Sequence, residues 1–221
     1  MPSFSGELRG AAESIWQAQH EHPFVRGIGD GSLDPERFRH YVRQDYLFLI
    51  EYGRLLALAC ARAPRLEVQE RFADLAQATL RTEMDLHRAY AAEWGIAREE
   101  LEAERPAPAT RAYTDFLLRT ATLGDFAELV AALLPCMWGY SEVGRTLAGR
   151  GRPANELYAR WIDMYAGDEF AELAGWCREI CDAAAADVGG AGRERMREAF
   201  LASSRHELAL WEMAWRMEGP R

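Results

Sequence analysis

The chain has 221 residues, of which 49% are hydrophobic and 28% are charged, and this composition excludes disordered and collagen-like proteins. The formal net charge of -9 disfavours nucleic acid as a partner, because phosphate would be repelled and no block of Lys and Arg compensates. The sequence has no uninterrupted apolar stretch of about 18 residues and no basic, apolar leader, so we expect a cytoplasmic protein without a membrane partner.

The residue usage predicts an all-α fold. Ala, Leu, Glu and Arg dominate, whereas hairpin turns and alternating β-branched runs are nearly absent. One core can still grow at this length, so we expect a single domain over residues 1–221, built as a compact bundle of seven or eight helices.

The first half of the chain predicts three helices. The first runs from about Ser5 to His20 and ends before Pro23, because a residue that precedes proline avoids helical geometry. The second begins with Asp34 and Pro35 as N-cap and first helical residue, and its apolar face recurs until Pro64. The third covers about 66–94 and ends at a glycine.

Proline and glycine divide the second half in the same way. After a loop that carries Pro106 and Pro108, a helix is expected over 110–123, and another over 125–147. The latter contains Pro135, which removes a backbone hydrogen bond and predicts a kink. Further helices are expected over 154–165, 168–186 and about 193–217.

Asp45 stands among aromatic residues of the second predicted helix. Phe48 and Tyr52 lie on neighbouring turns of the same face, since residues three and four apart are adjacent on a helix. The pattern fits a half-exposed carboxylate at the edge of the core as well as a functional group, and both interpretations stay open.

Cys136 follows Pro135 in a strongly apolar helix, and Tyr140 lies one turn further along the same face. A free cysteine in such a helix usually packs as a small apolar residue. As a nucleophile it would need a nearby base or positive charge, and none is visible in the local sequence.

Glu207 lies one turn before Trp211 on the last predicted helix. A buried carboxyl group there would favour its protonated form and could donate a proton near neutral pH. A surface carboxylate with Arg205 nearby is the alternative.

Two pairs of residues have the i, i+4 spacing of metal ligands. Glu83 and His87 form one, but no second pair of matching spacing accompanies them, and no metal or other cofactor is expected. Cys177 and Cys181 form the other and are interpreted as packing residues.

Four segments, taken in order, resemble the TenA family, also called aminopyrimidine aminohydrolases or thiaminase II, over essentially the whole chain. These segments are 38–46 (FRHYVRQDY), 83–87 (EMDLH), 134–140 (LPCMWGY) and 206–214 (HELALWEMA). The resemblance implies a fold like that of haem oxygenase without haem, and a homotetramer. It also implies hydrolysis of 4-amino-5-aminomethyl-2-methylpyrimidine to the hydroxymethyl pyrimidine and ammonia in thiamin salvage, with thiamin cleavage as a secondary activity.

The resemblance assigns roles to individual residues. Cys136 would attack the pyrimidine ring and Glu207 would protonate the leaving amine, which is too basic to depart as an anion. Asp45 would hold the ring nitrogen and the exocyclic amine. The remaining implied contacts with the substrate are aromatic: Phe48, Tyr113, Tyr140 and Tyr165. Leu210 and Trp215 depart from the residues that many relatives carry, so the shape of the pocket could differ.

Two other classes of function stay open at this point. One is an oxidase on the same fold, either quinone-forming or di-iron, although a di-iron site needs several converging carboxylates and histidines. The other is a regulatory protein that binds DNA, which the net charge and the lack of a basic recognition helix disfavour.

Overall fold

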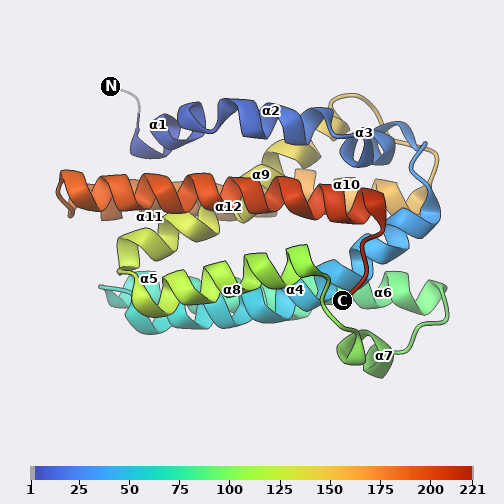
Figure 1. The fold of residues 1–221 in the computed structure, drawn as a ribbon, viewed down its shortest axis with the longest axis horizontal. Coiled ribbons are helices and arrows are strands. Elements are labelled where there is room, and N and C mark those ends of the chain that lie inside the picture. Colours follow the sequence, from blue (N-terminus) through green and yellow to red (C-terminus); the bar gives the residue numbers. More distant parts are fainter. Residues whose placement is uncertain (1–2, 221) are drawn as a thin grey trace. The chain divides into compact units, whose positions relative to one another are not determined.

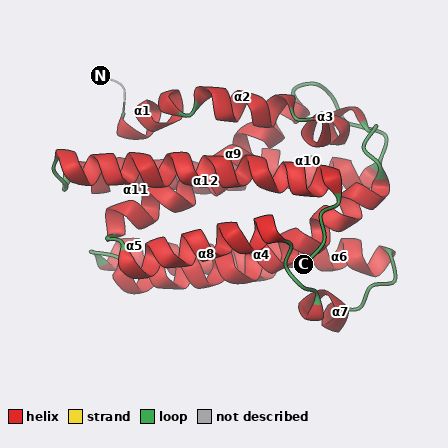
Figure 2. Ribbon diagram, in the orientation of Figure 1, coloured by secondary structure: helices red, strands yellow, loops and turns green. Residues whose placement is uncertain are grey.

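The computed structural model describes residues 3–220, and every regular element in that range is helical (Figures 1 and 2). The all-α class is therefore confirmed. These residues form twelve α-helices and one π-helical turn, so the predicted number of seven or eight helices was too low. Within the same range, no helix is both long and apolar enough to cross a membrane.

The described residues group into two compact units, each made of two stretches of the chain. The first unit comprises residues 3–34 and 127–212, and the second comprises 35–126 and 213–220. A single domain over the whole chain stays a prediction.

Helix α4 (Pro35–Arg62) is the centre of the second unit and begins at Pro35, as predicted. It packs against α5 (Leu66–Ala78), α6 (Met84–Glu93), α7 (Arg98–Ala103) and α8 (Pro108–Leu123). Figure 1 shows α4, α5 and α8 side by side. Buried residues recur along α4 every three or four positions, and this row places the polar Asp45 on the core face.

Helices α5 and α6 are joined by a π-helical turn, η1 (Thr79–Glu83), inside the segment predicted as one helix over 66–94. Buried residues recur in steps of three and four up to Thr79, and the next one, Met84, comes five residues later. The wider turn therefore keeps α6 facing α4 with His87 buried, whereas a regular helix continued from Thr79 would turn Leu86 inward. The Leu80 side chain of η1 lies over Gly53 of α4, where a Cβ would be 2.6 Å from Leu80 Cδ2.

The first unit contains α1 (Phe4–Ala11), α2 (Glu13–Glu21), α3 (Pro23–Asp30), α10 (Glu156–Ala166) and α11 (Asp168–Ala186). It also contains α9 (Phe126–Ala148) from Ala127 onward and α12 (Gly190–Arg216) up to Glu212. Helix α1 packs against α11, and α10 packs against both α3 and α11.

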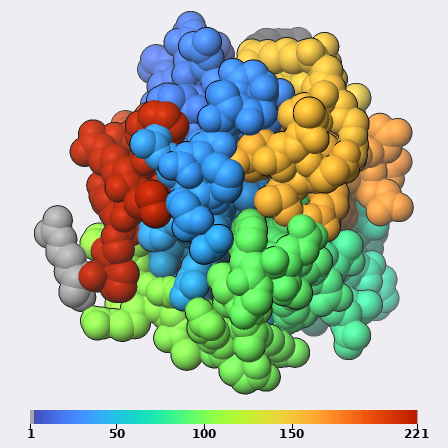
Figure 3. Space-filling model, turned by 90° about the vertical axis from the view of Figure 1, so that its right-hand side faces the viewer, coloured from blue at the N-terminus to red at the C-terminus, as the bar shows by residue number. Residues whose placement is uncertain are grey.

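The errors of prediction concern short helices. The helix predicted over 5–20 is divided at Ala12 into α1 and α2. Helix α2 ends at Glu21, before Pro23, as predicted, and His22 has non-helical geometry. The sequence did not predict α3, which Pro23 opens at its first position, where the missing N–H costs nothing, and which ends at Gly31 with φ 80°. The predicted loop before Pro106 contains α7, whose mostly exposed residues lie at the surface in Figure 3.

Helix α9 continues through Pro135, and the predicted kink stays a prediction. A proline leaves the carbonyl four residues earlier without its helical donor. One residue after that carbonyl, the Ala132 oxygen accepts a hydrogen bond of 2.6 Å from the Ser203 hydroxyl of α12. This bond ties α9 to α12 beside the proline.

Helix α9 also comes very close to the end of α10 at Gly144. A Cβ at this position would lie 2.6 Å from the carbonyl carbon of Tyr165 and 2.8 Å from the nitrogen of Ala166. Because backbone atoms cannot turn aside as a side chain can, only glycine permits this approach.

We expect Gly144→Ala to lower the free energy of unfolding by about 1–3 kcal/mol, because the backbone of α10 must move to admit the methyl group. Urea unfolding followed by circular dichroism measures the change. Gly175→Ala in α11 is the matched control, since a Cβ there meets nothing within 4 Å and alanine favours a helix. Equal stability of wild type and Gly144→Ala would contradict the proposed close approach.

Candidate functional site

Asp45 lies on the core face of α4 with only 5% of its surface exposed. Its Oδ2 atom accepts a hydrogen bond of 3.1 Å from the Tyr41 hydroxyl, one turn earlier, and lies 2.7 Å from Nε2 of His87 on α6. A buried carboxylate is costly unless donors satisfy it. These two groups supply the donors, and both contact the same oxygen.

His87 is fully buried, and both of its ring nitrogens have partners. Nδ1 lies 3.0 Å from the carbonyl oxygen of Glu83, which can only accept, so Nδ1 carries a proton. Burial alone would lower the pKa of His87, but the hydrogen bond and charge of Asp45, with help from Glu83, raise that pKa above its ordinary value. The raised pKa favours the protonated His87, which would form an ion pair with Asp45.

Phe48 and Tyr113 form an aromatic surface next to this pair. Phe48 lies one turn after Asp45 on α4, and its ring centroid is 5.0 Å from that of Tyr113 on α8 and 5.4 Å from that of Tyr52. All three rings are at most 2% exposed. The structure thus brings Asp45, Phe48 and Tyr113 together within the second unit.

Cys136 on α9 and Glu207 on α12 lie at the same level, that is, at matching positions along the contact between these two helices of the first unit. One turn before Cys136, the Ala132 carbonyl accepts from Ser203, which is one turn before Glu207. One turn after Cys136, the ring of Tyr140 lies 5.2 Å from that of Trp211, which is one turn after Glu207. Because the contacts run in the same order on both helices, the thiol and the carboxyl group lie on the facing sides of α9 and α12.

Four aromatic side chains form a cluster beside this level. The ring of Tyr140 lies 4.9 Å from that of Tyr165, and Trp161 lies 4.6 Å from Tyr165. Trp211 completes the cluster, and its indole N–H donates a hydrogen bond of 3.3 Å to Gln19. Glu207 itself is 1% exposed. The predicted residues Cys136, Tyr140, Tyr165 and Glu207 therefore belong to one region of the first unit.

The four cysteines differ in their surroundings. Cys177 and Cys181 are buried in α11, as expected of packing residues, and burial raises the pKa of the Cys181 thiol. Cys136 and Cys60 are partly exposed. A reactive cysteine must be reached by its substrate, so Cys136 meets a condition that the two cysteines of α11 do not.

The Glu83–His87 pair does not act as a pair of metal ligands in this structure. Both nitrogens of His87 are engaged by Asp45 and by the carbonyl of Glu83. Over residues 3–220, no group of three or more His, Cys, Asp or Glu side chains converges as a metal site would require.

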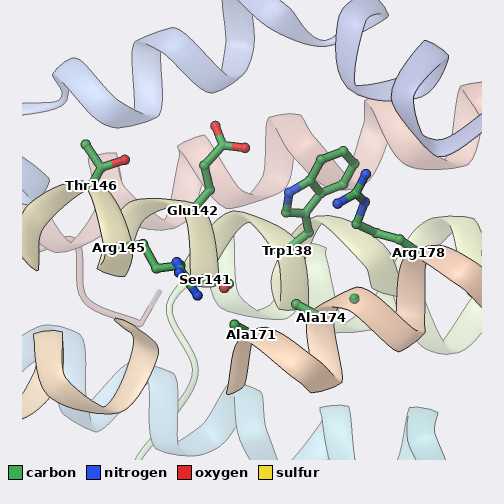
Figure 4. Close-up of a pocket in the computed structure, with 9 residues that line it drawn as sticks. Trp138, Ser141, Glu142, Arg145, Thr146, Ala171, Ala174 and Arg178 are labelled. Carbon is green, nitrogen blue, oxygen red and sulfur yellow. The ribbon is translucent and has the colours of Figure 1, made fainter. Parts of the chain in front are cut away.

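The surface pocket of Figure 4 lies in the first unit between α9 and α11 and has a volume of about 460 Å³. Trp138, Glu142 and Arg145 line it from α9, on the side of the helix away from Cys136 and Tyr140. Figure 4 shows the guanidinium group of Arg178 beside the Trp138 ring, and the distance to the ring centroid is 4.1 Å. The predicted site residues do not line this pocket.

The Glu142 carboxylate extends from α9 towards α1 and α2 (Figure 4). One of its oxygens lies 2.8 Å from Arg9 and 3.0 Å from His20. Burial alone would raise the pKa of Glu142, but the hydrogen bonds from His20 and Arg9 and the charge of Arg9 lower that pKa to about 2. The carboxylate is thus an ion-pair partner that joins α9 to the N-terminal helices.

Comparison with known proteins shows the family to which the chain belongs. Residues 9–217 match the TENA/THI-4/PQQC family, and the chain belongs to that family. It is 45% identical over 214 residues to the aminopyrimidine aminohydrolase of Halalkalibacterium halodurans, with 96% of each chain covered. It is 40% identical over 216 residues to the aminopyrimidine aminohydrolase of Bacillus subtilis, with 98% of this chain and 91% of the relative covered.

Solved structures share the fold. The TenA homologue from P. horikoshii OT3 superposes with a TM-score of 0.89 at 33% identity, covering 97% of this chain and 99% of that one. A domain with a heme oxygenase-like fold from Shewanella denitrificans superposes with a TM-score of 0.73 at 13% identity, covering 96% and 91%. The expected haem-oxygenase-like fold is confirmed.

Sequence reasoning missed two residues that complete the surroundings of Asp45. Tyr41 could have been found, because it lies one turn before Asp45 on the same face. His87 could not, because it reaches Asp45 from another helix and the distance between them along the chain is 42 residues.

We expect Glu142→Gln to lower the free energy of unfolding by about 1–3 kcal/mol at pH 7, because it removes a carboxylate whose pKa the fold lowers. This stabilisation is complete above the ordinary pKa of 4.5 and is lost as the pH falls towards 2. Urea unfolding at pH 7 and pH 3 measures the difference, with Glu172→Gln at an exposed position of α11 as control. A difference between wild type and Glu142→Gln that does not shrink at pH 3 would disprove the ion-pair explanation.

Proposed function

We propose that this protein is an aminopyrimidine aminohydrolase of thiamin salvage. Its substrate is 4-amino-5-aminomethyl-2-methylpyrimidine, and its products are the 5-hydroxymethyl pyrimidine and ammonia. The observation that carries the proposal is the placement of the partly exposed Cys136 level with the buried Glu207 on facing helices, in a member of this family.

Cys136 is the proposed nucleophile. Its thiolate adds to the ring carbon next to the one that bears the aminomethyl group, and the ring electrons then expel the amine as the C–N bond breaks. Water adds to the exocyclic carbon, and loss of the thiolate restores the aromatic ring. The balance is one water consumed and one ammonia released, and the cysteine is regenerated.

Glu207 is the proposed acid and base. An amine leaves only when it is protonated, so a carboxyl group level with the cysteine delivers a proton as the C–N bond breaks. The same group, now a carboxylate, takes a proton from the water that replaces the amine. The aromatic cluster of Tyr140 and Tyr165 lies beside this level and supplies the proposed ring contacts there.

Asp45 is the proposed binding group for the polar edge of the pyrimidine. The ring nitrogen, when protonated, and the exocyclic amine are donors, and a carboxylate accepts from both. The buried rings of Phe48 and Tyr113, tilted by 31° to each other, lie next to Asp45, and aromatic side chains of this kind suit contact with a pyrimidine ring.

Three finer features stay predictions: assembly as a homotetramer, location in the cytoplasm, and cleavage of thiamin itself. Light scattering coupled to gel filtration tests the first, and incubation with thiamin tests the last.

We expect Cys136→Ala to lose at least about 1,000-fold in kcat, because alanine cannot form the covalent intermediate. Ammonia release and the hydroxymethyl product are measured with purified protein. Cys60→Ala, which removes the other partly exposed thiol, is the matched control and should keep the wild-type rate. Normal turnover by a folded Cys136→Ala protein would refute covalent catalysis.

We expect Glu207→Gln to lose about 100- to 10,000-fold in kcat with a smaller change in KM, because the amide keeps the shape but cannot donate the proton. The assay of ammonia release and hydroxymethyl product measures this loss in kcat. Chemical support comes from a substrate analogue whose leaving group needs no proton, on which the variant should recover much of its rate. An equal deficit on both substrates would argue against the acid role.

A further inference from the structure

The proposed function assigns no role to the buried His87. His87 lies at the inward face of α6, is 0% exposed, and contacts Asp45 at 2.7 Å. It lies beside the edge of the Tyr90 ring, at 6.3 Å between centroids. Packing alone does not explain a buried imidazole with a carboxylate partner, because an aliphatic side chain would fill the same space without any desolvation cost.

The two oxygens of Asp45 are not equivalent. Oδ2 accepts a hydrogen bond of 3.1 Å from the Tyr41 hydroxyl and lies 2.7 Å from Nε2 of His87. Among the described residues, Oδ1 has no hydrogen-bond donor. One oxygen is anchored from two sides, and the other keeps its lone pairs for a ligand.

The protons on His87 follow from its partners. The Glu83 carbonyl accepts from Nδ1, and in the protonated ring, which the raised pKa favours, Nε2 donates the second ring proton to Oδ2 of Asp45. The charged groups near the ring are the Asp45 carboxylate and Glu83. The Tyr41 hydroxyl donates a hydrogen bond to Oδ2, the same oxygen that Nε2 of His87 contacts.

We propose that His87 is a positioning residue, which holds the Asp45 carboxylate by Oδ2 so that Oδ1 is presented to the amine and ring nitrogen of an aminopyrimidine. This proposal rests on the proposed function only in taking Asp45 as the binding carboxylate. A fixed carboxylate binds better than a mobile one, because the substrate need not order it. The raised pKa of His87 agrees with an imidazolium in this place.

The test compares His87→Leu, which loses the donor, with His87→Gln, whose amide N–H can still reach towards Asp45. We expect KM to rise at least about 10-fold in His87→Leu with kcat changed less than about 3-fold, and His87→Gln to recover much of the loss. His40→Leu is the matched control, since this half-buried histidine of α4 forms a hydrogen bond of 3.0 Å with the Glu218 carbonyl and, within residues 3–220, no hydrogen bond or ion pair with Asp45. Urea unfolding confirms that each variant is folded.

A double-mutant cycle with Asp45→Asn separates positioning from a general packing role. If His87 acts through Asp45, His87→Leu changes KM by less than about 2-fold in the Asp45→Asn background. The same 10-fold rise in both backgrounds would overturn the proposal, as would a normal KM in folded His87→Leu.

The same double-mutant cycle is also measured through the binding affinity, so that its result does not depend on turnover. Calorimetry with the aminomethyl pyrimidine measures Kd in the same four proteins, each also carrying Cys136→Ala so that the ligand is not consumed, and the same pattern is expected. If the wild type binds the pyrimidine without releasing ammonia, the proposed function fails and the role of His87 is still decided by Kd. If the wild type does not bind the pyrimidine at all, both proposals fail.

Discussion

The burial of the Asp45 carboxylate is the constraint on which the second unit depends. A carboxylate with 5% exposure must find donors inside the protein, and here they come from one turn back on α4 and from α6. Removal of one partner from a buried ion pair typically costs about 3–5 kcal/mol, because the other charge is left uncompensated. The packing of α6 against α4 is thus set by a polar contact as well as by apolar residues.

In the first unit, a row of contacts sets α9 against α12. A hydrogen bond from Ser203 to the Ala132 carbonyl fixes one end, and the contact of Tyr140 with Trp211 fixes the other. The proline in α9 leaves one backbone carbonyl without its helical donor next to the first contact, and large rings fill the second. The proposed catalytic level lies between two contacts of different physical kinds, so neither polar nor aromatic packing alone determines it.

The long helices and the family could be predicted from the sequence, and particular local causes explain the rest. Helix α4 begins at Pro35 because proline suits a first helical position, and the same rule, applied at Pro23, would have found α3. Helix α7 spans six residues, which is too short for a periodic pattern to be recognised. The residues quoted for the TenA resemblance include Asp45 and His87, but spacing on one helix suggested only a metal pair.

The contact between those two residues could not be predicted because it joins separate helices. Local spacing describes neighbours on one helix, whereas the partner of a buried charge is chosen by tertiary packing. The same holds for Cys136 and Glu207, whose common level depends on how α9 lies along α12.

At the π-helical turn 79–83, the number of residues in the turn decides whether a polar or an apolar side chain faces inward on the following helix. One extra residue in this turn brings an imidazole to the inner face where an uninterrupted α-helix would present the isobutyl group of Leu86. In this segment, the chemical character of the buried face therefore changes with an insertion or a deletion, whereas elsewhere it changes with a substitution. Gaps in an alignment of such chains would carry chemical information here that a comparison of residue types alone would overlook.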